Sequence, residues 1–164
     1  MSRHNVLSPF PESSHAHSRC LKVAVGKAEL ACHARGVRLT SLRRRVLELV
    51  WRSHEPVKAY DILSRLRTER RGAAPPTVYR ALDFLRAEGF VHKIESLNAY
   101  VGCGAPGHMS SGQFLICRRC GEVAEVDDSE IASLIADKAR QLGFASERQT
   151  IEVDGLCGDC RAAR

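Results

Sequence analysis

The sequence predicts a two-domain α/β protein whose front half is helical and ends in a β-hairpin, and whose back half carries a three-stranded antiparallel sheet. Hydrophobic residues recur every three to four positions through four segments of the front half, whereas short, partly alternating segments make up the back half. A Gly/Ser/Pro-rich linker over 104–112 separates the two patterns. We therefore expect an extension over 1–17, a first domain over 18–103 and a second domain over 113–164.

The composition is that of a globular protein with room for two small domains. Its 164 residues are 44% hydrophobic and 27% charged, which is close to ordinary usage. The sequence has no run of about 18 apolar residues and no signal peptide at its start, so we expect a cytoplasmic protein without a membrane partner. The Ser/Pro/His-rich opening over 1–17 shows no amphipathic period and is expected to be mobile.

The charge is unevenly distributed between the two halves. Residues 1–95 carry 18 Lys and Arg against 9 Asp and Glu, and residues 96–164 carry 7 against 10, so the overall charge of +6 comes from the front half. Basic groups near phosphates release condensed counterions into solution. The front half is therefore the part that favours a polyanion as its partner.

Four helices are expected in the front half, each between recognisable start and stop signals. Gly36 closes the first helix, and Thr40 is a good N-cap for the second. Pro76 lies where the start of a helix tolerates proline, and Gly89 ends the fourth helix. The predicted helices span residues 19–34, 41–52, 59–70 and 77–88.

The fourth helix has the pattern of a DNA recognition helix. An apolar face directed inward leaves Thr77, Tyr79 and Arg80 available to solvent near its start, where side chains reach base edges in the major groove. A hairpin over 90–95 and 98–102 follows it, so the order of elements is that of a winged helix-turn-helix. A small helical domain with a solvated basic face remains the other interpretation. The inward residues are Val78, Ala81, Leu82 and Leu85.

The back half alternates strands with one helix. Strands are expected over 113–116 and 122–126, a helix follows over 129–142, and Gly143 stops it. A third strand is expected over 144–153, just before a turn that contains cysteines.

Two C-x-x-C pairs are the most specific chemical signal in the chain. Seven cysteines are an odd number, which argues against a framework of disulfides and for thiolate ligands. A redox site would use a single pair between a strand and a helix, whereas here each of two pairs follows a strand. Together they complete a tetrahedral sulfur shell for a structural zinc ion. The four cysteines are Cys117, Cys120, Cys157 and Cys160.

A second group of metal-competent residues lies around the linker. The plausible turns of the hairpin set His92 opposite either Val101 or Cys103, and in both cases His92 and Cys103 share a strand face. His108 in the linker and Glu125 on a strand of the back half complete a mixed shell that suits zinc. Taken singly, each of these residues also fits an ordinary structural role.

The sequence resembles the ferric uptake regulator family from about Cys20 to Cys160, and most closely its zinc-responsive branch. The resemblance implies a homodimer in which each subunit joins a winged helix-turn-helix to an α/β dimerisation domain. It also implies repression of zinc-import genes when zinc is plentiful. The segments that carry it are GVRLT at 36–40, AYDIL at 59–63, PPTVYRALDFL at 75–85, GFVHKIES at 89–96 and the two C-x-x-C pairs.

The resemblance also implies roles for individual residues. It places Tyr60 and Arg80 at the bases of a double-stranded operator, and it implies two zinc ions per subunit, no small-molecule substrate and no enzymatic activity. Glu122 is a rival carboxylate for the second zinc, although its odd offset from Glu125 directs it to the opposite strand face. The implied structural ligands are Cys117, Cys120, Cys157 and Cys160, and the implied regulatory ligands are His92, Cys103, His108 and Glu125.

Two other function classes stay open. One is a regulator of the same fold that senses iron, manganese or peroxide, although the short linker, with His108 as its one histidine, favours zinc over iron. The other is a zinc-dependent hydrolase or deaminase, which needs an open coordination position and a general acid or base. The sequence contains neither H-E-x-x-H nor H-x-E with a partnered P-C-x-x-C.

Overall fold

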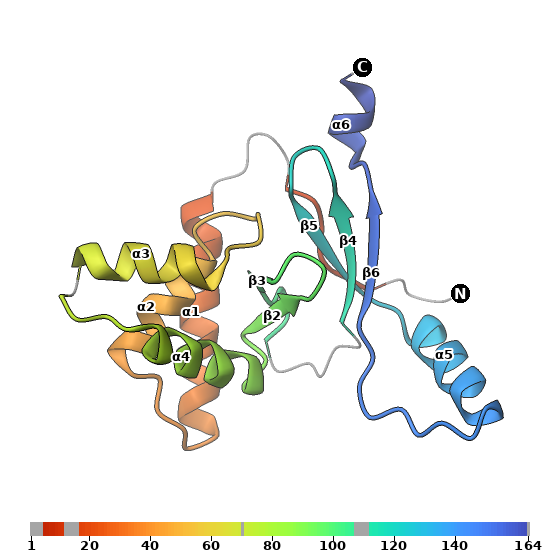
Figure 1. The fold of residues 1–164 in the computed structure, drawn as a ribbon, viewed down its shortest axis with the longest axis horizontal. Coiled ribbons are helices and arrows are strands. Elements are labelled where there is room, and N and C mark those ends of the chain that lie inside the picture. Colours follow the sequence, from red (N-terminus) through yellow and green to blue (C-terminus); the bar gives the residue numbers. More distant parts are fainter. Residues whose placement is uncertain (1–4, 12–16, 70, 107–111, 164) are drawn as a thin grey trace. The chain divides into compact units, whose positions relative to one another are not determined.

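The computed structural model describes residues 5–11, 17–69, 71–106 and 112–163 (Figure 1). They form two compact units. One contains the described residues between 11 and 108, and the other combines the described residues up to Phe10 with those after 109. The chain therefore contributes its first strand to the unit that also contains its C-terminal part. None of the helices in the described part of the chain is both long enough and apolar enough to cross a membrane.

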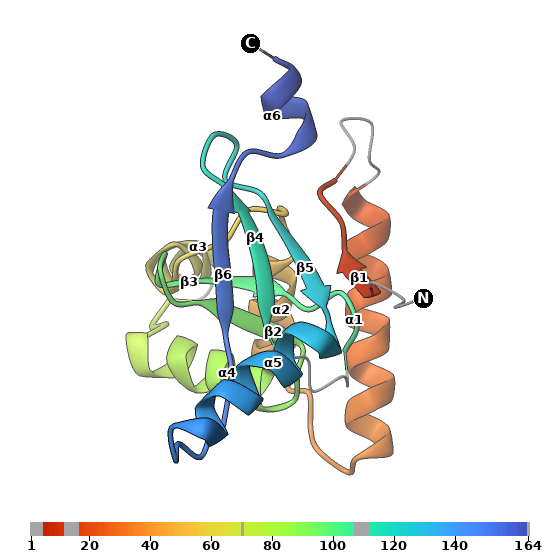
Figure 2. The same cartoon turned by 90° about the vertical axis from the view of Figure 1, so that its right-hand side faces the viewer.

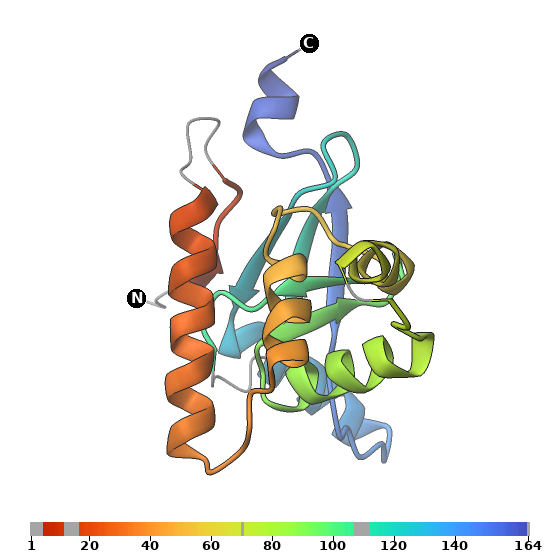
Figure 3. The same ribbon diagram turned by 90° about the vertical axis from the view of Figure 1, so that its left-hand side faces the viewer.

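All four helices predicted for the first unit are present, and their ends differ from the predicted ones by up to two residues (Figure 3). The Thr40 hydroxyl accepts the Arg43 backbone N–H at 3.3 Å and caps the second helix as expected. The fourth helix begins two residues earlier than predicted, because the first turn of a helix tolerates both prolines. The helices are α1 His17–Ala34, α2 Ser41–Val50, α3 Ala59–Glu69 and α4 Pro75–Ala87.

The apolar faces of these helices share one hydrophobic core. The inward face predicted for α4 is confirmed, since Val78, Ala81, Leu82 and Leu85 are all buried. Burying a large aliphatic side chain contributes about 1.5 to 3 kcal/mol. Cys32 also belongs to this core, which agrees with its interpretation as a small packing residue.

The predicted hairpin is formed by β2 Val91–Ile94 and β3 Ala99–Gly102. Its antiparallel register pairs His92 with Val101, which decides between the two registers that the sequence left open. Asn98 adopts a left-handed conformation with φ 46° in the connecting turn, as asparagine tolerates more readily than most residues. This hairpin is the wing of the helical unit.

The three consecutive arginines of α2 make contacts inside the helical unit. The Arg43 guanidinium lies 3.6 Å from the centre of the Phe84 ring on α4. Arg44 pairs with Glu29 on α1, and Arg45 donates to Glu69 on α3 at 2.8 Å. The run therefore connects α2 with each of the other three helices.

The second unit is a four-stranded mixed sheet in the order β1-β5-β4-β6 (Figure 2). The prediction of a three-stranded antiparallel sheet is wrong in two respects: β6 runs parallel to β4, and a fourth strand is added. After β5 the chain is at the sheet end where β4 begins. A helix and a loop keep it there, so β6 starts beside the start of β4. The elements are β4 Gln113–Cys117, β5 Val123–Asp127, α5 Ser129–Gln141 and β6 Ile151–Gly155.

Two further elements were not predicted. The strand β1 Asn5–Ser8 pairs with the free edge of β5, whereas no strand was expected over 1–17. Residues 1–4 and 12–16 of that opening lie outside the described residues. The short helix α6 Gly158–Ala162 follows β6 and is capped by Cys157. The strand predicted over 144–153 begins only at Ile151.

The packing of α4 leads to the first prediction. Leu82→Ala should lower the free energy of unfolding by about 2 to 5 kcal/mol, because it leaves a cavity at a fully buried position. The free energy is measured by urea denaturation at a fixed zinc concentration. The matched control is Leu30→Ala at a position that is 74% exposed, where the change should stay within about 0.5 kcal/mol. Equal losses in the two variants would contradict the assigned core.

Candidate metal centres and nucleic-acid interface

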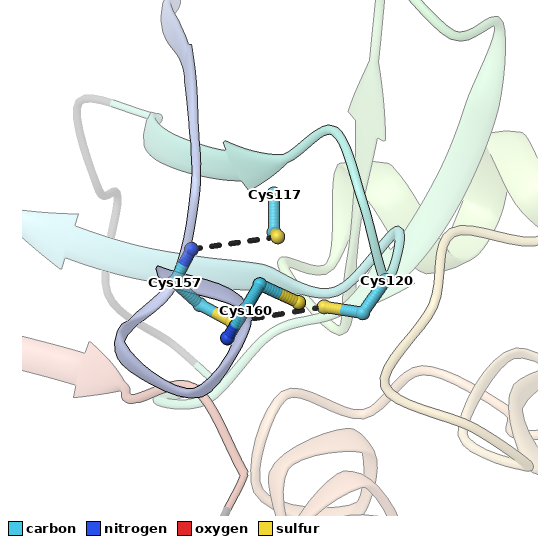
Figure 4. Close-up of side chains that lie close together, drawn as sticks. All are labelled: Cys117, Cys120, Cys157 and Cys160. Atoms are coloured by element: carbon cyan, nitrogen blue, oxygen red, sulfur yellow. Dashed lines mark hydrogen bonds between the residues drawn. The ribbon is translucent and has the colours of Figure 1, made fainter. Parts of the chain in front are cut away.

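The four predicted cysteines converge in the sheet unit (Figure 4). Their Sγ atoms all lie within 4.8 Å of one another, and those of Cys120 and Cys157 are 3.8 Å apart. Zinc–sulfur bonds of about 2.3 Å in a tetrahedron require an S···S separation of about 3.8 Å. A disulfide needs about 2.05 Å, and all seven cysteines are free thiols. The spacing therefore fits a metal shell and does not fit a disulfide.

Strand pairing explains why these cysteines meet. Cys117 is the last residue of β4 and lies beside Gly155, the last residue of the parallel strand β6. Both C-x-x-C turns therefore follow strands that finish at the same end of the sheet. In the first turn Gly121 has φ 79°, a conformation that favours glycine, and its N–H donates to the Cys117 carbonyl at 2.9 Å. In the second turn the Cys160 N–H donates to Cys157 Sγ at 3.5 Å.

The thiols of this cluster differ in acidity. Backbone hydrogen bonds from Cys120 and Cys157 lower the pKa of Cys117 to about 6. Burial raises the pKa of Cys120 and of Cys160. Since metal ligation requires thiolates, a divalent cation bound here would supply the positive charge that keeps four adjacent sulfurs deprotonated.

Two further residues lie at the cluster. The sequence predicted no role for Arg119 and a different role for Glu122. Arg119, inside the first C-x-x-C, donates to the carbonyls of Cys160 and Ala163 at 2.8 Å and so holds α6 against the first turn. No local signal identifies this contact, because its acceptors lie more than 40 residues away. Glu122, the rival carboxylate for the second zinc, lies 3.4 Å from Cys120 Sγ. The structure therefore places Glu122 at the four-cysteine cluster.

The wing brings together two residues of the second predicted group. A ring nitrogen of His92 and the Sγ of Cys103 lie within 4.8 Å of each other. His92 pairs with Val101, and Val101 and Cys103 are two residues apart, so all three share a strand face. Cys103 is 1% exposed, and its N–H donates to the Phe90 carbonyl at 3.0 Å. An imidazole and a thiolate at this separation are suitable donors for zinc.

The other two predicted ligands of the second group are Glu125 and His108. Glu125 lies on β5 of the sheet unit, paired with Phe114, and is 3% exposed. A carboxylate so deeply buried is unusual unless it is paired or binds a metal. His108 lies outside the described residues.

The predicted DNA-facing residues are on the surface of the helical unit. Thr77, Tyr79 and Arg80 are exposed in the first turns of α4. Tyr60 is 73% exposed and lies at the start of α3. Two large aromatic side chains that remain in water, Tyr60 and Tyr79, suit contact with a partner.

The chain is similar to known proteins over most of its length. The chain is 44% identical over 139 residues to the zinc uptake regulation protein of Escherichia coli (strain K12), covering 83% of this chain and 80% of that protein. It is 32% identical over 132 residues to the zinc uptake regulation protein of Mycobacterium tuberculosis (strain ATCC 25618 / H37Rv), covering 79% and 98%.

A solved structure of similar fold is a zinc uptake regulator complexed with zinc and DNA, with a TM-score of 0.81, 39% identity and coverage of 87% of this chain and 96% of that chain. The ferric uptake regulator family model matches residues 34–154, from the end of α1 to β6, and so spans both units. With a match over most of its length, and with close relatives in the same group, this chain belongs to the ferric uptake regulator family.

Proposed function

We propose that this chain is a zinc-dependent transcriptional repressor that binds operator DNA as a homodimer and controls zinc-uptake genes, with no enzymatic activity. One observation carries the proposal. The exposed start of α4 and the His92–Cys103 pair on the adjoining wing belong to the same compact unit. The names of the relatives, and the zinc and DNA in one similar structure, support it.

In this proposal, the exposed starts of α3 and α4 bind the operator. Arg80 is the candidate for a bidentate contact to guanine in the major groove. The run Arg43 to Arg45 is a poor candidate for phosphate contacts, since its charges contact Phe84 and glutamates of the same unit. The proposed DNA-binding residues are Tyr60, Thr77, Tyr79 and Arg80.

The homodimer is supported by the apolar surface of the sheet unit. The helix α5 has no buried residue, although Ile131, Leu134 and Ile135 form an apolar stripe. Leu115 and Val153, paired neighbours on β4 and β6, are also 41% and 50% exposed. Apolar surface of this extent is typical of a face that is covered in the assembly.

Two zinc sites per subunit are proposed. The structural site consists of Cys117, Cys120, Cys157 and Cys160. The regulatory site consists of His92, Cys103, His108 and Glu125. Since the regulatory ligands come from both units, their simultaneous coordination links the recognition helix to the dimerising part. The thiolate of Cys103 favours zinc over harder cations.

The regulation needs only a modest coupling energy. Typical coupling free energies between two sites are about 1 to 3 kcal/mol, and the effect is reciprocal. Binding to the operator is therefore expected to tighten the regulatory site for zinc by the same factor by which zinc tightens the protein on DNA.

The structural site leads to the second prediction. Cys160→Ser should reduce the zinc content of the purified protein by about one ion per chain and destabilise the sheet unit, because zinc coordination stabilises small metal-binding folds by about 10 kcal/mol or more. Zinc content is measured by mass spectrometry and stability by thermal unfolding. The control is Cys20→Ser, a cysteine on α1 outside the cluster. If Cys160→Ser keeps the full zinc content, this assignment is wrong.

The regulatory site leads to the third prediction. Cys103→Ser should keep the structural zinc but lose the increase in operator affinity on adding zinc, because the regulatory shell loses its only thiolate. Operator affinity is measured at fixed salt over a zinc titration. Unchanged zinc-dependent binding in this variant would remove Cys103 from the mechanism.

The recognition helix leads to the fourth prediction. Arg80→Ala should weaken binding to the operator by about 1 to 3 kcal/mol, because it removes hydrogen bonds to one base. The comparison is with random DNA at the same salt concentration, where the loss should be smaller. Arg44→Ala serves as the matched arginine control and should leave the salt dependence unchanged, since Arg44 pairs with Glu29 and Glu48. Equal losses on both DNAs would make Arg80 a phosphate contact.

A further inference from the structure

Gly102, the last residue of β3, lies directly against the indole of Trp51. A Cβ atom at position 102 would be 2.1 Å from Cε2, 2.3 Å from Nε1 and 2.6 Å from Cζ2 of Trp51. These are atoms of a rigid bicyclic ring, so no small side-chain rotation relieves the overlap. The indole therefore occupies the space that any side chain at position 102 would need.

The position of the indole relative to the candidate metal ligands follows from strand geometry. Successive side chains of a strand point to opposite faces. Position 102 shares its face with Tyr100, which is buried in the core of the helical unit. Val101 and Cys103 belong to the other face, which they share with His92. Trp51 therefore supports β3 from the side opposite the metal ligands, one residue before Cys103.

The backbone of Trp51 is held by helix α2. Trp51 is the C-cap of α2, and its backbone N–H donates to the Leu47 carbonyl at 3.0 Å. The segment that follows returns along β3, where Val57 and Tyr100 exchange two backbone hydrogen bonds of 2.9 and 2.8 Å. The strand β3 is thus paired with β2 on one edge, bridged by Val57 on the other, and covered by the indole on its core face.

We propose that the contact between Trp51 and Gly102 positions Cys103 for zinc, which makes these two residues positioning residues of the regulatory site. The inference rests on the proposed function of that site. Metal–ligand distances tolerate deviations of only about 0.2 Å, so the strand that carries the thiolate must be held closely. Substitutions in groups that orient a ligand typically cost about 10- to 100-fold in metal affinity. A glycine at position 102 lets the rigid ring reach the backbone itself.

The experiment measures zinc affinity by competition with a chelator, on the full chain with its structural site filled. Gly102→Ala should weaken zinc binding at the Cys103 site by about 10- to 100-fold, because the added methyl group displaces β3 from the indole. The matched control is Gly26→Ala on α1 of the same unit, where an added Cβ meets no atom within 4 Å. Its zinc affinity should equal that of the unmodified protein.

A second pair of variants separates positioning from general destabilisation. Trp51→Leu combined with Gly102→Ala removes the ring that the methyl group meets and leaves the leucine to pack against that methyl group, so the double variant should regain part of the zinc affinity lost by Gly102→Ala alone. Should Gly102→Ala not fold, Trp51→Phe takes its place: its smaller ring loses part of the contact, and its zinc affinity should fall at least several-fold.

The outcomes distinguish this inference from the proposed function. If Cys103→Ser abolishes the measured site but Gly102→Ala or Trp51→Phe binds zinc as the unmodified protein does, the positioning role is wrong and the regulatory site stands. If the double variant regains no zinc affinity, the loss does not come from the Trp51–Gly102 contact, and the inference is again overturned. If Cys103→Ser itself leaves zinc binding unchanged, the regulatory site fails and the inference fails with it.

Discussion

The sheet unit depends on one constraint, which is that four thiols converge where the strands β4 and β6 end. The cysteines come from two turns 40 residues apart and meet because β4 and β6 run in parallel and end side by side. The buried apolar residues of this sheet are few, chiefly Phe114, Ile116, Val123 and Ala124. A core of that size gives limited stability by itself. The proposed structural zinc, assisted by the Arg119 contacts to α6, thus compensates for a small hydrophobic core.

The helical unit shows that a basic sequence is not the same as a basic binding surface. Arg43, Arg44 and Arg45 form the densest positive run in the chain, yet each contacts a different neighbouring helix. Such surface ion pairs contribute little stability individually, but together they relate α2 to α1, α3 and α4. In the proposed function, the charge that remains for the operator is carried by other side chains, with Arg80 at the exposed start of α4.

The wing links the candidate metal ligands to α4, the proposed recognition helix, through backbone hydrogen bonds. The N–H of Phe90 donates to Leu85 in the last turns of α4, and its carbonyl accepts from Cys103. With His92 two residues after Phe90, the ligand pair and α4 form one closely bonded block inside the helical unit. In the proposed mechanism, zinc therefore acts by tying this block to the other unit, and the internal geometry of the recognition helix stays unchanged.

The sequence by itself predicted most of the elements of this protein and the cysteines that converge in its sheet unit. Local periodicity was enough to predict four helices and the inward face of α4, and the spacing of the C-x-x-C pairs was enough to predict a four-cysteine cluster. The direction of β6, the pairing of β1 with β5, and the location of Glu122 at the cysteines were decided only by the tertiary structure. The tertiary structure also decided that the indole of Trp51 lies against Gly102. Each of these depends on contacts between residues distant in the chain, or on which face of a strand meets which neighbour, and a local pattern carries neither kind of information.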